Sequence, residues 1–175
     1  MSKENVECEA KFRVIELSSV ERRLVDANFS FNREEDQRDT YFKHPTRAGL
    51  SSFPTYLRVR TYGARSSIAM HHKLANFKWA EDETSVTDGD VVRRIYENLG
   101  FDIDVEVHKL RRYFKRGEME VVLDDVKGLG TFIEIEGPSV DAVFECAASL
   151  GFLRADAEAL EGKSYADLVR GAIVG

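Results

Sequence analysis

The stretch from Asn5 to Ile15, NVECEAKFRVI, alternates strictly between two kinds of side chain. An alternation of period two is typical of a β-strand with one face packed on a core. The polar face of this strand carries Glu7, Glu9 and Lys11 in a row, whereas its other face is formed by Val6, Cys8, Ala10, Phe12 and Val14. This charged face decides how the rest of the chain is interpreted, because similar faces recur on later segments.

The later charged faces also carry their residues two apart. The pairs are Arg58 with Arg60, Lys109 with Arg111, and Glu134 with Glu136, while Lys73 lies within another predicted strand and Asp124 ends one. The solvated face of an ordinary sheet carries charges scattered in sign. We therefore expect a closed or nearly closed antiparallel β-barrel with a polar lumen, and with apolar residues packed outward against helices.

Periodicity and turn residues predict the remaining elements. We expect eight strands, over residues 5–15, 39–43, 56–61, 67–74, 83–86, 105–115, 118–124 and 132–136. Helices are predicted over about 19–28, after Asp88, after Ser139 and after Ser164. The polar run 32–38, the Gly-, Ser- and Pro-containing stretch 44–54 and the segment 76–82 are expected outside strands. The predicted class is α+β, mainly β.

Composition limits the function. The chain has 175 residues, 25 Lys and Arg, 31 Asp and Glu, and a formal charge of −6. We expect one domain over 1–175, no membrane span, no signal segment and a cytoplasmic location. The acidic balance argues against a nucleic-acid partner. Cys8 and Cys146 are far apart and lack the spacing of a zinc site or a disulfide framework.

The predicted lumen holds both signs of charge. Five carboxylates come from Glu7, Glu9, Asp124, Glu134 and Glu136, and six cations come from Lys11, Arg58, Arg60, Lys73, Lys109 and Arg111. Six confined cations repel one another unless a multiply charged anion joins them. Carboxylates are the oxygen ligands that Mg²⁺ or Mn²⁺ prefers. A triphosphate with its divalent metal satisfies both groups.

These residues resemble the CYTH superfamily of triphosphate tunnel metalloenzymes. The resemblance begins with the ExExK pattern at Glu7, Glu9 and Lys11 and continues in order over nearly the whole chain, through DTYF at 39–42, LRVR at 57–60, KLR at 109–111, LD at 123–124, GLGTFIEIE at 128–136 and SY at 164–165. The length, the DTYF segment and the SY pair are most similar to the class IV adenylate cyclase branch.

The resemblance implies an eight-stranded tunnel, often dimeric, that binds ATP or another triphosphate with divalent metal. It places metal at Glu7, Glu9, Asp124, Glu134 and Glu136, and phosphates at Lys11, Arg58, Arg60, Lys73, Lys109 and Arg111. The predicted catalytic residues are Lys11, Glu9 and Glu136. Lys11 is the candidate base, on the expectation that neighbouring cations depress the pKa of a lumen lysine.

Three functions remain open from sequence. The first is a cyclase that converts ATP to cyclic AMP and pyrophosphate. The second is a thiamine triphosphatase or an inorganic triphosphatase, in which the same tunnel directs water at the terminal phosphorus. The third is a non-catalytic module that binds triphosphate or polyphosphate. His71 and His72 alternate faces, so at most one points into the lumen, and structural roles are favoured over metal binding for both.

Overall fold

The computed structural model describes residues 6–43 and 55–174. Its elements are β1 (Val6–Val14), α1 (Leu17–Asp26), β2 (Ser30–Lys43), β3 (Thr55–Tyr62), β4 (Arg65–Ala75), β5 (Lys78–Val86), α2 (Gly89–Asn98), β6 (Asp102–Arg116), β7 (Met119–Val126), β8 (Gly130–Gly137), α3 (Val140–Ser149), α4 (Arg154–Glu158) and α5 (Tyr165–Val174). Within these residues no helix is long and apolar enough to cross a membrane.

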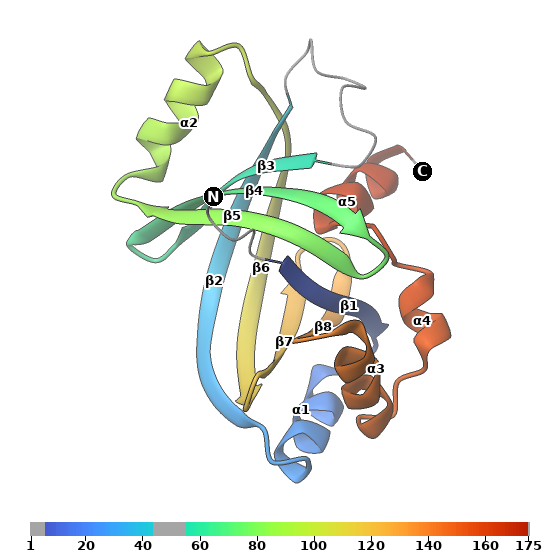
Figure 1. The fold of residues 1–175 in the computed structure, drawn as a ribbon. Coiled ribbons are helices and arrows are strands. Elements are labelled where there is room, and N and C mark those ends of the chain that lie inside the picture. Colours follow the sequence, from blue (N-terminus) through green and yellow to red (C-terminus); the bar gives the residue numbers. More distant parts are fainter. Residues whose placement is uncertain (1–5, 44–54, 175) are drawn as a thin grey trace.

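The strands form one closed antiparallel barrel in the order β1-β5-β4-β3-β2-β6-β7-β8 (Figure 1). Strand β1 closes it, because its first residues pair with β5 and most of its length pairs with β8. In that second ladder Glu9 lies opposite Glu136 and Lys11 opposite Glu134. The predicted eight-stranded antiparallel barrel is confirmed, and side chains of alternating residues point into it.

Two predicted boundaries are wrong. The polar run 32–38 belongs to β2, which starts at Ser30 and pairs with β6 along nearly its whole length. Strand β5 starts at Lys78, so most of the segment expected to connect two strands is itself strand. Phe77, with φ of 60°, makes the turn before it. Helix α4 was not predicted, and the predicted loop 44–54 lies outside the described residues.

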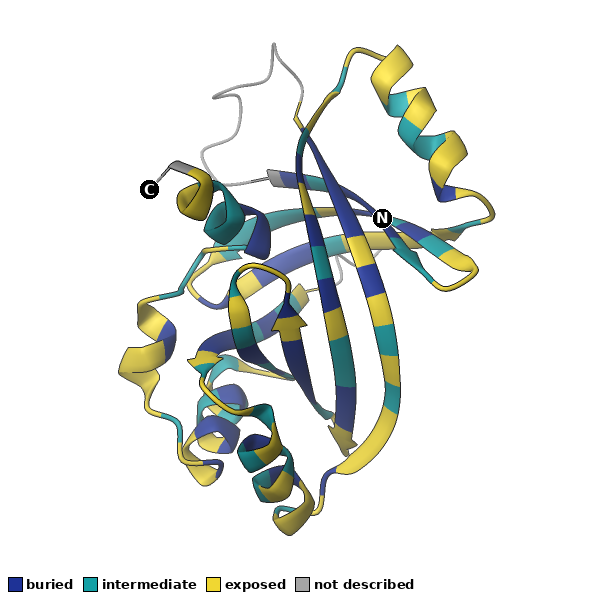
Figure 2. Ribbon diagram, turned by 180° about the vertical axis from the view of Figure 1, so that it is seen from behind, coloured by how far each residue is buried: buried dark blue, intermediate teal, exposed yellow. Residues whose placement is uncertain are grey.

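The main apolar core lies outside the barrel, as expected. Helices α1, α3 and α4 cover the outer faces of β1, β7 and β8, and the inward-facing positions of these helices are buried (Figure 2). Phe12, Leu123 and Ile133 are fully buried there. Burying this outer face leaves the inner face free to carry charge.

A second apolar cluster lies against α5. It contains Tyr41, Tyr56, Trp79, Phe132 and Tyr165, all buried. This cluster is an exception to the expected polar lumen, because residues of α5 reach the inward faces of the strands at this end of the barrel.

Candidate active site

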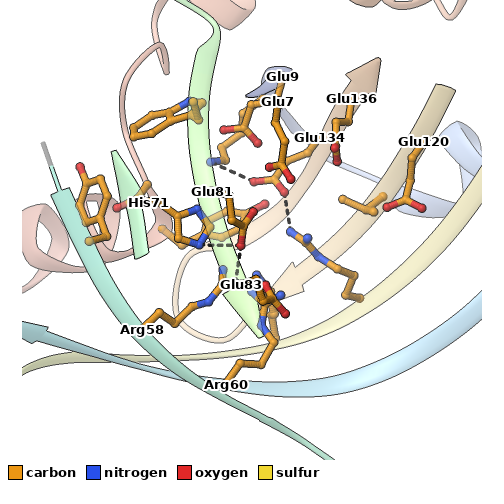
Figure 3. A pocket seen from close by; sticks show the side chains of 18 of the residues that line it. Glu7, Glu9, Arg58, Arg60, His71, Glu81, Glu83, Glu120, Glu134 and Glu136 are labelled. Carbon is orange, nitrogen blue, oxygen red and sulfur yellow. Dashed lines mark hydrogen bonds and ion pairs between the residues drawn. The ribbon is translucent and has the colours of Figure 1, made fainter. Parts of the chain in front are cut away.

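A cavity of about 310 Å³ occupies the barrel lumen. Its lining includes seven carboxylates and six cations, and the aromatic cluster beside α5 contributes Tyr41, Tyr56, Trp79 and Tyr165. Figure 3 shows Glu7, Glu9 and Glu136 on one side of this cavity and Arg58 and Arg60 on the other. The charged residues on the lining are Glu7, Glu9, Glu81, Glu83, Glu120, Glu134, Glu136, Lys11, Arg33, Arg58, Arg60, Lys109 and Arg111.

Two arginines of the lumen are held by buried aspartates. Arg60 donates to both carboxylate oxygens of Asp39, at 2.6 and 2.8 Å. Arg111 donates to both oxygens of Asp124, at 2.7 and 2.6 Å, and also to Glu134 at 2.5 Å. Two-point pairing fixes the plane of a guanidinium. Both arginines are therefore oriented by the protein.

Arg58 is held differently. Its Nη2 donates to Glu81 at 3.0 Å and to Glu83 at 2.9 Å. Its Nε is buried and has no hydrogen-bond partner among the described residues. A buried donor without an acceptor is costly, and a phosphate oxygen is an acceptor that would satisfy it.

Three carboxylates lie together without a cation of their own. Burial, with the nearby Glu81 and Glu136, raises the pKa of Glu7 to about 10. Burial and Glu134 raise the pKa of Glu9 to about 7, and burial and Glu9 do the same for Glu136. Mutually repelling carboxyl oxygens of this kind fit a hard divalent cation such as Mg²⁺ or Mn²⁺. Among the described residues, however, no three potential ligands already surround one point.

The two lumen lysines differ, and the reason given for Lys11 as a base is wrong. Burial alone would lower the pKa of Lys11, but Glu134 and Glu9 outweigh it, and the pKa is raised. Nζ of Lys11 lies 2.9 Å from Glu134. For Lys109, burial and the adjacent Arg111 lower the pKa to about 7. Of the two lysines, Lys109 is the one whose pKa is lowered.

Nine of the eleven predicted site residues line the cavity, whereas Lys73 and Asp124 do not. Lys73 forms an ion pair with Glu161 at 2.6 Å. Asp124 has no exposed surface, because its oxygens accept from Arg111 and from the hydroxyl of Tyr165. Metal or phosphate roles for these two residues stay predictions, and their protein partners argue against them.

Sequence reasoning missed several lining residues. Arg33 lies on the polar run that proved to be strand β2, and Glu81 lies on the part of β5 expected to be a connection. His71 points into the lumen, with Nε2 2.9 Å from Glu81. Extending the two strands by alternation would have found Arg33 and Glu81.

The segment from Glu161 to α5 covers one end of the barrel. Lys11 of β1 donates to the carbonyl of Lys163, Lys73 of β4 binds Glu161, and Tyr56 of β3 donates to Asp167. Tyr165 donates to Asp124 of β7. These contacts to β1, β3, β4 and β7 hold the segment over this end of the barrel.

A closed antiparallel barrel with cations and carboxylates facing one internal cavity defines a tunnel domain of the kind that binds triphosphates. The chain belongs to the CYTH family, since the CYTH domain model matches residues 5–150. Its fold and family are those of triphosphate tunnel enzymes.

Three known proteins are similar to this chain. A Methanocaldococcus jannaschii protein named "Putative adenylate cyclase" is 27% identical over 135 residues, which cover 75% of this chain and 76% of that protein. The solved PH1012 protein of Pyrococcus horikoshii is 27% identical, with a TM-score of 0.81 over 93% of this chain and 98% of that chain. A solved Hippeastrum protein shares the fold at 19% identity, with a TM-score of 0.60 over 89% and 93% of the two chains.

Proposed function

We propose that this protein is a metal-dependent adenylate cyclase of class IV type, which converts ATP to cyclic AMP and pyrophosphate. The observation that supports this most directly is the arrangement of charge in one cavity. On one side stand oriented arginines and the buried Nε of Arg58, which has no partner within the described part of the chain. On the other side stand carboxylates that repel one another. The name of the Methanocaldococcus jannaschii relative points to the same activity.

In this proposal the triphosphate oxygens are held by five cations of the lumen, namely Arg58, Arg60, Arg111, Lys11 and Lys109. Fixed guanidinium groups keep the phosphate chain in one conformation, so the ribose 3′-oxygen can approach the α-phosphorus opposite the departing pyrophosphate. The 3′-oxygen bonds to the α-phosphorus, the bond from that phosphorus to the pyrophosphate oxygen breaks, and the 3′-hydroxyl proton passes to solvent or to a lumen base.

Glu7, Glu9 and Glu136 would hold the divalent metal. When bound, the metal supplies positive charge that stabilises the phosphate oxygens as negative charge develops on them. The carboxylates themselves fix where this charge lies. Their raised pKa values indicate that, without a cation, they are not all ionised at neutral pH.

A triphosphatase is the second candidate. The solved Hippeastrum protein is named an adenylyl cyclase and is described as having a dominant triphosphatase activity, so this fold can support hydrolysis of a triphosphate. In this chain the same cations would hold thiamine triphosphate or inorganic triphosphate, and water would replace the ribose hydroxyl as nucleophile.

The deciding experiment incubates the purified protein with Mg²⁺ or Mn²⁺ and, in parallel, ATP, thiamine triphosphate and inorganic triphosphate. Cyclic AMP with an equal amount of pyrophosphate is the expected result. Orthophosphate without cyclic AMP would assign a triphosphatase. Tight binding with neither product, and with unchanged affinity in EDTA, would assign the non-catalytic module.

A further inference from the structure

Lys109 lies at the covered end of the cavity. It comes from β6, its side chain is 2% exposed, and its Nζ lies 4.9 Å from the centre of the Tyr165 ring. Lys11 faces the same ring from β1, at 4.4 Å. An ammonium group at this depth has lost most of its water, so its charge must be stabilised by protein groups or by a ligand.

The nearby carboxylates are already engaged by arginines. Asp39 contacts Lys109 at 3.4 Å, but both of its oxygens accept shorter hydrogen bonds from Arg60. Asp124 is engaged in the same way by Arg111. Lys109 therefore lies beside two arginines that already form two-point ion pairs with the two aspartates.

Charged or titratable groups face Lys109 from each neighbouring element. Arg111 and Arg60 oppose its charge, while Asp39 and Asp124 favour it. Glu134 also interacts with it electrostatically, and Tyr165 lies over it with a pKa raised by burial and by Asp124. Burial and the two arginines outweigh the acids, and the pKa of Lys109 falls to about 7.

We propose that Lys109 is a substrate-linked proton site: above neutral pH its side chain is mostly a neutral amine in the empty tunnel, and it takes a proton from solvent when a triphosphate enters. The inference rests on the proposed triphosphate binding. An anion carrying several charges reverses the local balance that keeps Lys109 neutral, so the ammonium form becomes the stable one. The positive charge of Lys109 is then present in the tunnel only when substrate is bound.

Lys11 provides the internal contrast. It has Glu134 at 2.9 Å, and its pKa is raised, so it carries its proton before any ligand arrives. Both lysines contact a carboxylate that an arginine also contacts. Lys11 lies against the Glu134 oxygen that Arg111 does not use, whereas Lys109 shares its Asp39 oxygen with Arg60 and lies farther from it. The difference comes from their partners, since both side chains are buried.

Titration calorimetry of the full chain tests this, with inorganic triphosphate as the probe and EDTA present so that nothing turns over. Measurements at pH 8 in two buffers of different ionisation enthalpy give the number of protons taken up on binding. We expect the wild type to take up close to one proton more than Lys109→Arg, because a guanidinium stays charged throughout. At pH 6 this difference should fall to about a tenth.

Two further variants keep the test sharp if arginine fits poorly at this depth. Lys109→Gln is permanently neutral and should also lack the extra proton. Lys11→Arg should keep the wild-type proton uptake. Between pH 7 and pH 9 the wild-type affinity should fall by up to about tenfold per pH unit relative to that of Lys109→Arg.

The outcomes separate this inference from the proposed function. Triphosphate binding with equal proton uptake in the wild type and both Lys109 variants at pH 8 overturns the role of Lys109 and leaves the proposed function standing. No triphosphate binding by the wild type overturns both.

Discussion

Asp39 and Arg60 form a two-point ion pair across the β2 and β3 ladder, with N to O distances of 2.6 and 2.8 Å. Asp39 is almost fully buried, and Arg60 lowers its pKa well below the usual range despite burial. Asp39 does not line the cavity, yet it sets the orientation of an arginine that does. It is therefore a positioning residue for the proposed phosphate site.

Asp39→Asn should reduce the free energy of unfolding by about 3 to 5 kcal/mol, because it leaves the guanidinium of Arg60 buried without its counter-charge. Urea unfolding at pH 7 measures this. Glu158→Gln is the control, since Glu158 pairs with Arg154 on the surface and its loss should cost less than about 0.5 kcal/mol. Equal effects of the two substitutions would contradict the role of Asp39.

Arg58→Ala should weaken triphosphate binding by about 1.5 to 3 kcal/mol, or roughly 10- to 150-fold in the dissociation constant. The reason is that Arg58 offers a buried Nε with no protein acceptor among the described residues. Calorimetry with inorganic triphosphate measures the change. Arg112→Ala is the matched control, because Arg112 points away from the lumen toward Glu21. An unchanged constant for Arg58→Ala would remove Arg58 from the phosphate site.

Glu9→Gln and Glu136→Gln should each abolish metal-dependent turnover while leaving the fold intact. An amide occupies nearly the same space but carries no charge for a metal, and it relieves the repulsion between these two carboxyls. Product formation and circular dichroism measure the two effects. Glu118→Gln, at an exposed turn, is the control. Full activity in both lumen variants would contradict the proposed metal site.

Metal-free protein should lose stability as pH rises from about 5 to 8. Glu9 and Glu136 have pKa values near 7 in the folded chain and near 4.5 when unfolded, so the folded state binds more protons in this range. Stability therefore falls as pH rises, with each of the two carboxyls contributing on the order of 2 kcal/mol to the fall. Thermal unfolding against pH measures it.

Added Mg²⁺ should reverse this loss of stability at higher pH. The increase in melting temperature on adding Mg²⁺ should be larger at pH 8 than at pH 5, because at low pH protons compete for the same carboxylates. Glu9→Gln should show a smaller pH dependence than the wild type. A Mg²⁺ effect that is the same at both pH values would argue that these carboxylates do not bind the metal.

The barrel could be predicted because β1 alternates apolar and charged residues, and because the charged pairs recur at the spacing of strands. The first half of β2 could not, since Glu34, Asp36 and Arg38 on its outer face are polar too. These three side chains are exposed, so no apolar alternation is required. An alternation of apolar and polar residues predicts a strand only where one face of that strand is buried.

Most of the lining could be predicted from the inward parity of the strands, but its electrostatics could not. Asp39 and Arg60 are 21 residues apart in sequence, and only the β2 and β3 register brings them together. The same holds for Lys11, whose pKa depends on Glu134 in the opposite strand. Alternation in the sequence predicts that both signs of charge face the lumen, but it does not predict which charges pair.

The segment from Glu161 to α5 covers one end of the barrel, and this limits how a ligand can enter the lumen. We expect this segment to prevent a polymer from being threaded past Lys109, so that the free end of a phosphate chain, rather than its middle, reaches this lysine. The two products are also expected to leave the lumen one after the other. If pyrophosphate is formed at the inner end, cyclic AMP must leave before it, and pyrophosphate should then inhibit in competition with ATP.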